Sequence, residues 1–386
     1  MAQLTDTARP LRGWFGVAAT AAATFTVVTS EMLPVGLLTP IGSALRVTEG
    51  VAGLTLTITG LVAAVSAPLL TPLLGRLDRR LALAALMVVL ALGNLLAAWS
   101  PGFGVMVAGR VLVGVGMGGV WAIAAGLGAR LVPGRPSATA LIFSGIAVAS
   151  VLGVPLGTYL GELADWRTVF LVAAVLALAV AVALVVLLPP LPAEPGLRLS
   201  GVLRLVGDPR AGTGLAVVAL LVTGHFAAYT YVRPVLAEVS GVDSGLGALL
   251  LGYGIAGVAG NFAAGWAAAR SPRATLAGLG VVLAAAVLLI PLLGGGIVLM
   301  VVWGLAYGGV SVGTQTWLLA SVPHAREAGS ALFVGVFNAA IAAGALVGGR
   351  VADGLGVTAV MWAGGALAVA AAVVAGLGRA PASGRL

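Results

Sequence analysis

Residues 168–190 read TVFLVAAVLALAVAVALVVLLPP, with no Asp, Glu, Lys or Arg among them. A helix needs about 20 consecutive apolar residues to cross the hydrocarbon core of a bilayer, so this stretch is long enough for one crossing. Comparable stretches without these four residues recur at 50–75, 81–109, 111–129, 136–161, 244–269, 274–325, 328–349 and 354–378. The pattern predicts a chain that crosses a membrane many times.

The composition of the whole chain agrees with this prediction. Of its 386 residues, 60% are hydrophobic and 8% are charged, whereas about 25% of the residues of a soluble domain are charged. A membrane β-barrel would show segments of about 10 residues in which apolar and polar side chains alternate, and no such alternation occurs. We therefore expect an all-α integral membrane protein.

Breaks at Pro, Gly and clustered charges divide the chain into twelve transmembrane helices. These are expected near 14–38, 51–74, 81–99, 103–128, 137–159, 167–189, 211–235, 244–268, 275–293, 296–320, 328–350 and 357–378. The longest polar interval, 191–210, is a candidate cytoplasmic linker. It would separate two six-helix bundles, formed by residues 1–190 and 211–386.

The basic residues predict how the chain lies in the membrane. A net charge of +8 and an isoelectric point near 11.1 could indicate nucleic-acid binding, but the 20 basic residues, all Arg, form no stripe. With the N-terminus inside, 15 fall on inner segments, four on outer segments and Arg110 inside a span. Positive residues stay on the cytoplasmic side during insertion. Both termini are therefore expected in the cytoplasm, and no nucleic-acid partner is expected.

Residues that the chain lacks exclude several kinds of chemistry. It has no Cys, which excludes thiolate metal sites and Cys nucleophiles. His225 and His324 are the two His residues, with no second ligand at metal spacing. An intramembrane enzyme would need paired carboxylates or an activated nucleophile at depth, and a channel would need rings of charged or carbonyl-lined segments. We expect neither of these, and no metal or organic cofactor.

The two predicted halves contain an internal repeat. A shift of 190 residues places Val111, Gly114, Gly118, Gly119 and Val120 on Val301, Gly304, Gly308, Gly309 and Val310. Since each half has six spans, the two copies share one orientation in the membrane, as parallel transporter repeats do. The glycines of 114–119 resemble a nucleotide loop, but no strand precedes them and no Lys-Ser/Thr follows. We expect them to allow close helix packing instead.

Two motifs in the first half resemble the Major Facilitator Superfamily, in particular its bacterial drug/proton antiporter branch, which includes sugar and arabinose efflux proteins. Residues 30–41, SEMLPVGLLTPI, resemble that branch's first helix. Gly109-Arg110, followed by Gly114, Gly116 and Gly118, is similar to the membrane-embedded Arg motif. The resemblance covers the whole chain and implies two six-helix bundles, transport by alternating access, and a monomer. Together with the Arg-only basic residues and abundant Ala and Gly, it indicates a bacterial cytoplasmic (inner) membrane.

Further motifs are similar to those that the family uses for its conformational change. Gly145, Gly153, Pro155 and Gly157 match the antiporter motif of the fifth helix, which we expect to bend against a partner in the other half. The loop after the second span has Leu74 where the family has Gly, followed by Asp78, Arg79 and Arg80. In the second copy Gly265 and Arg270 match, but Ala269 replaces the acidic residue.

Ionisable groups inside spans are costly and are therefore site candidates. Glu31, Arg110 and His225 lie well inside predicted spans. At a rise of about 1.5 Å per residue, Glu31 and Arg110 each lie about 12 Å below the outer surface, and the resemblance places both helices on one cavity. We expect Glu31 to carry the coupling proton and Arg110 to set its affinity; a purely structural pair is the alternative. Pro34 lacks the N–H that would bond to the carbonyl of Ser30, and is expected to let the first helix flex.

Polar and aromatic side chains on shared helix faces are candidates for a substrate cavity, because residues three, four or seven apart lie on one face. They are Thr24, Met117, Trp121, His225, Tyr229, Tyr253, Asn261, Tyr307, Gln315 and Asn338. Packing between helices explains any single one of them equally well. Their convergence from both halves favours a substrate site.

Together these observations predict a secondary active transporter for a small organic molecule such as a drug, sugar or metabolite. Resemblances in the first and fifth helices favour proton-coupled efflux, with the proton gradient as energy source. Proton-coupled uptake or facilitated diffusion in the same fold is the alternative. A single acidic residue is compatible with cations, neutral drugs, sugars or purines, so the substrate is not named by the sequence.

Overall fold

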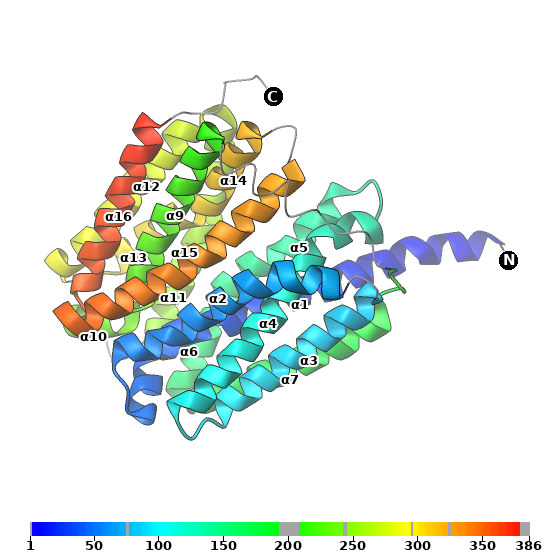
Figure 1. Ribbon diagram of the computed structural model, residues 1–386, viewed down its shortest axis with the longest axis horizontal. Helices are drawn as coiled ribbons and strands as arrows, with labels where there is room; N and C mark the ends of the chain where they lie inside the picture. The colour runs from blue at the N-terminus through cyan, green and yellow to red at the C-terminus, as the bar shows by residue number, and fades with distance from the viewer. Residues whose placement is uncertain are drawn as a thin grey trace. The chain divides into compact units, whose positions relative to one another are not determined.

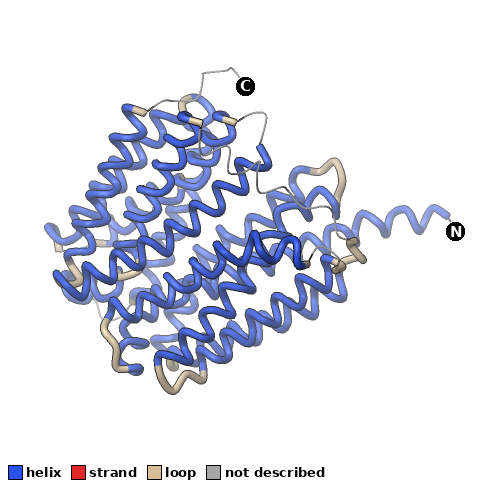
Figure 2. The backbone as a smooth tube through the Cα atoms, viewed as in Figure 1, coloured by secondary structure: helices blue, strands red, loops and turns tan. Residues whose placement is uncertain are grey.

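The protein is helical along its described length. The structure, a computed structural model, describes residues 2–74, 77–192, 208–241, 245–294, 296–322 and 326–378. Within these ranges every regular element is a helix, and Figure 2 draws helices and loops only. The predicted all-α fold is confirmed.

The order of the helices follows the predicted spans (Figure 1). The first half contains α1 Ala2–Leu45, α2 Glu49–Leu73, α3 Arg79–Ala98, α4 Phe103–Leu131, α5 Pro136–Val148, a π-helical turn Ala149–Gly153, α6 Val154–Leu163 and α7 Trp166–Leu187. The second contains α9 Pro209–Tyr229, α10 Val232–Ser240, α11 Leu246–Arg270, α12 Pro272–Leu293, α13 Ile297–Gly308, α14 Val310–Ser321, α15 Arg326–Leu355 and α16 Ala359–Leu377.

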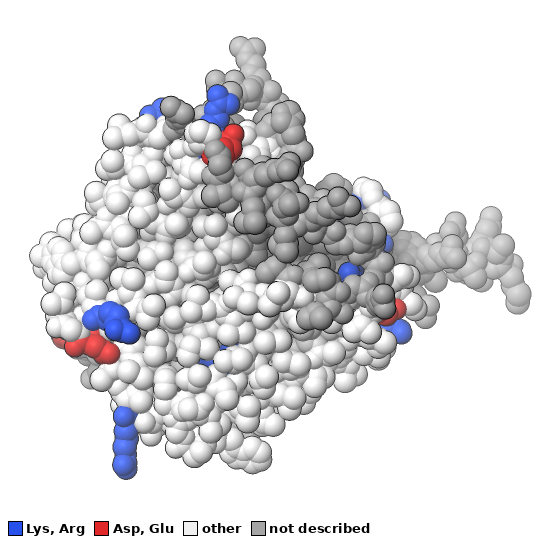
Figure 3. Space-filling view, in the orientation of Figure 1, with Lys and Arg blue, Asp and Glu red and all other residues white. Residues whose placement is uncertain are grey.

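Twelve helical segments of the described chain are long and apolar enough to cross a membrane, as predicted. Helix α7 illustrates how such a helix is built. Val175 and Val186 are 60% and 72% exposed, while Ala174, Ala177 and Ala181 on the opposite face are buried. Large apolar side chains thus face outward and small ones face the protein, which suits a lipid surrounding. On the face drawn in Figure 3, most charged side chains lie at the margins.

Three of the predicted single helices are interrupted, and the first helix is longer than predicted. The fifth span contains the π-helical turn, just before Pro155. The seventh breaks between Tyr229 and Val232, where Pro234 cannot donate a hydrogen bond to the carbonyl of Thr230. The tenth breaks at Gly309. Helix α1 ends at Leu45, beyond the predicted end at 38.

Contacts divide the chain into two units: Met1–Leu33 with Ile58–Gly196, and Pro34–Thr57 with Leu197–Leu386. They are called unit 1 and unit 2 below. In unit 1, α3 packs against α4 and α7; in unit 2, α12 packs against α13 and α16. Residues 193–207, most of the predicted linker 191–210, lie outside the described residues. The predicted bundle boundaries remain a prediction.

The internal repeat is visible in the helix packing of each unit. On α4, a Cβ added to Gly114 or Gly118 would collide with the main-chain oxygens of Thr59 and Ala63 on α2. On α13, the equivalent Gly304 and Gly308 pack in the same way against the main-chain oxygens of Tyr253 and Gly257 on α11. The glycines therefore allow close helix contact, as the sequence predicted.

Candidate functional site

Arg110 lies at the centre of a buried polar cluster in unit 1. Its side chain is 0% exposed. Nε donates to the hydroxyl of Thr59 at 3.0 Å, Nη1 to the carbonyl of Ser30 at 2.9 Å, and Nη2 to the carbonyl of Glu31 at 3.0 Å. Helix α4 supplies the guanidinium, and α1 and α2 supply the acceptors. A planar group with five N–H donors can satisfy three separate acceptors at once.

Pro34 explains why the Ser30 carbonyl is available to Arg110. In a continuous α-helix the N–H of residue 34 would bond to the carbonyl of residue 30. Proline has no N–H, so that carbonyl lacks its usual helical partner, and Arg110 supplies one. The predicted gap in the bonding of α1 is thus filled from α4.

Glu31 is 3% exposed, and its Oε1 atom has no hydrogen-bond partner. Arg110 lies against the same residue, at its main-chain carbonyl. The predicted approach of Glu31 and Arg110 is therefore present. Helix α1 ends at Leu45, however, and not at the predicted position near residue 38. Their role in proton coupling remains a prediction.

Asn94 on α3 belongs to the same cluster and was missed in the sequence. Its Nδ2 donates to the hydroxyl of Ser30 at 3.0 Å and to the carbonyl of Leu90 at 3.1 Å. Its Oδ1 is buried without a partner. The sequence could have identified Asn94, because an amide in the middle of an apolar span is costly unless it is hydrogen-bonded.

The fifth-helix motif packs against α1 within unit 1. A Cβ on Gly145, Gly153 or Gly157 would collide with side-chain atoms of Thr24, Thr29 and Leu33, respectively. Thr24, predicted to line the cavity, donates to the carbonyl of Ile142 at 2.6 Å and so joins α1 to α5. Within unit 1 the nearest neighbours of these glycines lie on α1; the expected partner in the other half remains a prediction.

Unit 2 contains a group of six aromatic rings in contact, one of which is Phe226 on α9. The other five are called the ring cluster below: His225 and Tyr229 on α9, Tyr253 on α11, and Trp303 and Tyr307 on α13. His225 stacks on Tyr307 with ring centroids 3.4 Å apart and on Tyr229 at 4.8 Å. Four of these residues were predicted as cavity candidates, and the structure brings them together. Trp303 was not predicted, since it reads as one more apolar residue of its span.

Trp303 determines which nitrogen of His225 carries the proton. Its Nε1 lies 3.0 Å from Nδ1 of His225. An indole N–H can only donate, so Nδ1 accepts and the neutral imidazole carries its proton on Nε2. His225 therefore presents an N–H donor on the side of the ring away from Trp303.

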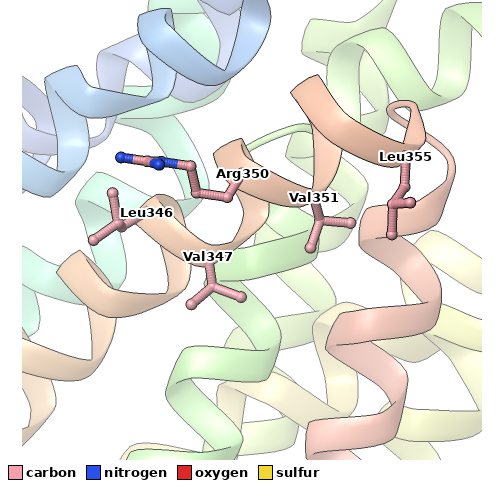
Figure 4. Close-up of a pocket in the computed structure, with 5 residues that line it drawn as sticks. All are labelled: Leu346, Val347, Arg350, Val351 and Leu355. Atoms are coloured by element: carbon pink, nitrogen blue, oxygen red, sulfur yellow. The ribbon is translucent and has the colours of Figure 1, made fainter.

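The remaining cavity candidates are spread over several environments. Met117 is part of the packed core of unit 1, and Trp121 packs against that core and stacks on Phe143. Asn338 donates to the carbonyl of Val334 within α15. Asn261 is exposed and Gln315 is half-buried. A hollow in unit 2 contains none of them; Figure 4 shows its lining residues Leu346, Val347, Arg350, Val351 and Leu355 along α15.

In the loop between α2 and α3, the charged residues of the family motif form hydrogen bonds with main-chain groups. Asp78 caps α3 by accepting from the N–H of Arg80 at 2.8 Å, and also accepts from the N–H of Leu191 at 3.1 Å. Arg79 donates to the carbonyl of Leu74 at 3.2 Å. These contacts tie the start of α3 to the chain after α7.

The second copy of this motif is arranged differently. Arg270 donates to the carbonyl of Trp266 and lies 3.6 Å above its ring. A Cβ on Gly265 would lie at ordinary contact distance from Val312. The two copies of the motif thus differ in their contacts: Asp78 accepts from main-chain N–H groups in the first, and Arg270 donates to a main-chain carbonyl in the second.

Asp353 of α15 holds the start of α2 within unit 2. Its carboxylate accepts from the N–H of Gly50 at 3.1 Å and from the hydroxyl of Thr48 at 2.9 Å. A carboxylate at a helix N-terminus is favoured by the unpaired N–H groups there. Arg233, also in unit 2, donates to the carbonyl of Gly36 at 2.6 Å.

No group of three or more His, Cys, Asp or Glu side chains that could hold a metal ion occurs among the described residues.

Comparisons with known proteins cover nearly the whole chain. The sequence model of the Major Facilitator Superfamily matches residues 20–333. The purine ribonucleoside efflux pump NepI of Salmonella paratyphi B is 35% identical over 374 residues, covering 95% of this chain and 94% of that protein. NepI of Escherichia coli K12 is 34% identical over 368 residues, covering 94% and 93%.

Solved structures show the same fold at lower sequence identity. A bacterial homologue of the human lysosomal transporter Spinster aligns with a TM-score of 0.79 and 16% identity, covering 96% of this chain and 97% of that chain. The human organic anion transporter MFSD10 (TETRAN) aligns with a TM-score of 0.67 and 19% identity, covering 94% and 99%. With twelve candidate spans and a family match over most of its length, the chain belongs to the Major Facilitator Superfamily and is a multi-pass membrane transporter.

Proposed function

We propose that this transporter exports a purine ribonucleoside, or a small molecule with a similar heteroaromatic base, in exchange for protons. The observation that carries the proposal is the similarity to purine ribonucleoside efflux pumps at 34–35% identity over nearly the full length of both chains. The proposed location is the bacterial cytoplasmic membrane, with both termini inside, and the proposed active form is a monomer.

Glu31 is the proposed proton carrier. Its Oε1 atom is buried and unbonded, so a proton can be taken up there without breaking a hydrogen bond. Burial favours the neutral form of a carboxyl group and a neighbouring Arg favours the charged form. Any change in the distance or hydration of Arg110 would therefore drive uptake or release of the proton.

The energy available to one proton is sufficient for useful transport. Moving one charge through 100 mV supplies about 2.3 kcal/mol. Since about 1.4 kcal/mol corresponds to a tenfold concentration ratio, one proton per substrate can support a gradient of about 50-fold. A second carboxylate is not required.

Inverted membrane vesicles from cells that express the protein test this proposal. When respiration acidifies the vesicle lumen, labelled inosine or guanosine should accumulate inside, and a protonophore should abolish the accumulation. Control vesicles lack the protein. Proton-driven accumulation in right-side-out vesicles instead would favour the uptake alternative, and no accumulation of any purine ribonucleoside in either orientation would overturn the proposed substrate.

A further inference from the structure

Four rings of the ring cluster form a nearly parallel stack. The His225 ring lies at 9° to Tyr307, 22° to Tyr229 and 20° to Tyr253. Tyr229 and Tyr253 stack with centroids 4.9 Å apart. Trp303 stands across the stack, at 78° to His225, 82° to Tyr229 and 89° to Tyr253. The stacked rings other than Tyr307 are buried, and Trp303 and Phe226 both stand edge-on to His225.

The ring cluster carries more polar groups than packing requires. Tyr253 is 7% exposed, and its hydroxyl is buried without a hydrogen-bond partner. Leaving a buried hydroxyl unbonded is destabilising, and Phe would fill nearly the same space without that cost. A side chain that only packed would therefore not need the oxygen atom. The hydroxyl points to a missing partner.

The backbone around Tyr253 is held in place by close helix packing. The main-chain oxygen of Tyr253 lies against Gly304 on α13, so closely that a side chain on Gly304 would collide with it. The same two helices meet again at Gly257 and Gly308. A residue on such a fixed backbone presents its polar atom in a constant position, which reduces the entropy lost on binding.

His225 supplies a second group of defined character. Because Trp303 donates to Nδ1, the proton of the neutral ring lies on Nε2, which can donate. A heteroaromatic base has ring nitrogens and carbonyl oxygens that accept and amino groups that donate. The Nε2–H group of His225 can donate to an acceptor of the base. The Tyr253 hydroxyl can both donate and accept, so it can bond to either kind of group on the base.

We propose that the ring cluster holds the base of the transported molecule. The base stacks on the parallel rings, and its edge forms hydrogen bonds with the Tyr253 hydroxyl and Nε2 of His225. Trp303 is a positioning residue that fixes the tautomer of His225. This inference rests on the proposed function, because it takes the transported molecule to be a purine ribonucleoside. Stacking on aromatic side chains accepts any base, because every base has a π-face, so the two hydrogen-bonding groups would distinguish one base from another.

Binding to the purified protein, measured by isothermal titration with inosine, guanosine and adenosine, tests the proposal. Tyr253→Phe should raise Kd about tenfold for any of the three nucleosides whose base forms a hydrogen bond with the Tyr253 hydroxyl. The Kd of a nucleoside whose base forms no such bond should rise less. Ribose, which lacks a base, should not compete. Trp303→Phe should weaken binding and change the order of preference among the three nucleosides. Tyr159→Phe removes the hydroxyl of an exposed Tyr on α6 and is the matched control.

The outcomes separate the two proposals. If wild-type protein binds none of the three nucleosides, both the proposed function and the ring-cluster assignment are overturned. If wild-type protein binds them and Tyr253→Phe and Trp303→Phe bind all three as tightly as the control does, only the ring-cluster assignment is overturned. An equal loss of affinity for all three, with a lower melting temperature, would show a packing role and would also overturn it.

Discussion

Arg110 donates a hydrogen bond from Nη1 to the main-chain carbonyl of Ser30, over 2.9 Å. The guanidinium thereby becomes part of the hydrogen bonding of α1, at the carbonyl that Pro34 cannot serve. Through Nη2 it also holds the carbonyl of Glu31. The residue that bears the proposed coupling proton and the geometry of its helix therefore depend on the same cation.

Glu31→Gln should abolish proton-driven transport and leave substrate binding and downhill exchange intact. Glutamine keeps the size of the side chain and one carbonyl oxygen, but it cannot take up and release a proton near neutral pH. Transport by purified protein in liposomes with an imposed proton gradient measures the first effect, and counterflow without a gradient measures the second. Gradient-driven, pH-dependent transport retained by Glu31→Gln would rule out Glu31 as the carrier.

Arg110→Lys should lower both stability and transport rate, although the charge is kept. A Lys ammonium cannot reproduce the planar set of donors that reaches Thr59, Ser30 and Glu31, and each buried acceptor left unbonded costs about 1–3 kcal/mol. We expect a melting temperature several degrees lower in detergent and at least a tenfold slower transport. Arg46→Lys changes an exposed Arg and should do neither. If the two variants had equal melting temperatures and equal transport rates, the hydrogen bonds of Arg110 would not have the role described here.

Gly153→Leu should impair transport while ligand affinity stays nearly unchanged. Gly153 lies against Thr29, so a larger side chain would push α1 and the π-helical turn apart. Gly126→Leu is the control, because no atom lies within 4 Å of a Cβ built there. Transport and equilibrium binding are measured on the same preparations. A loss of affinity as large as the loss of transport would instead place Gly153 in the binding site.

Gly308→Ala should destabilise the protein. Its Cβ would overlap the main chain of Gly257 on α11, which can yield only if the two helices move apart. Overpacking of this kind costs about 1–3 kcal/mol. Gly335→Ala in α15, where a Cβ meets nothing within 4 Å, should be neutral or stabilising by up to about 1 kcal/mol. Thermal unfolding in detergent compares the two, and a smaller effect at Gly308 would refute the packing argument.

Cysteine labelling tests the predicted topology, and the absence of native Cys makes it simple. In intact cells an impermeant thiol reagent should label a Cys at the outer position Gly296 and should not label one at the inner position Leu77. Gly296 is preferable to Gly241 as an outer site, because Gly241 has φ 63 and Cys would be strained there. Ser200 and Ala325, two further inner positions, lie outside the described residues. The reverse labelling pattern would invert the orientation.

Composition and periodicity predicted the number of spans well, because each crossing must be long and apolar whatever its neighbours are. They could not predict the breaks near Tyr229, at Gly309 and at Ala149–Gly153. These depend on how one missing N–H or one small residue is accommodated by the surrounding helices. An apolar stretch reads the same with or without such an interruption.

The sequence predicted some residues of the candidate site and missed others. Glu31 and Arg110 were identified because an ionisable group is conspicuous in an apolar span. Asn94 and Trp303 were missed. The cost of an unbonded amide in an apolar span applied to Asn94 as well, whereas Trp303 reads as one more apolar residue until its contact with His225 is known. Sequence shows which groups need partners, and only three-dimensional contact shows which partners they have.

The π-helical turn Ala149–Gly153 has a consequence for the ancestry of the chain. A π turn holds one residue more than an α-helical turn does, and one residue corresponds to a rotation of about 100° around the helix. Deleting a single residue such as Val151 would therefore remove the extra residue and the wide turn together, which would convert the segment to continuous α-helix and leave Gly157 facing Leu33. A relative that lacks this one residue would still present the same side of its fifth helix to the first, so a one-residue gap at this point of an alignment marks the loss of the π turn and not a rotated helix.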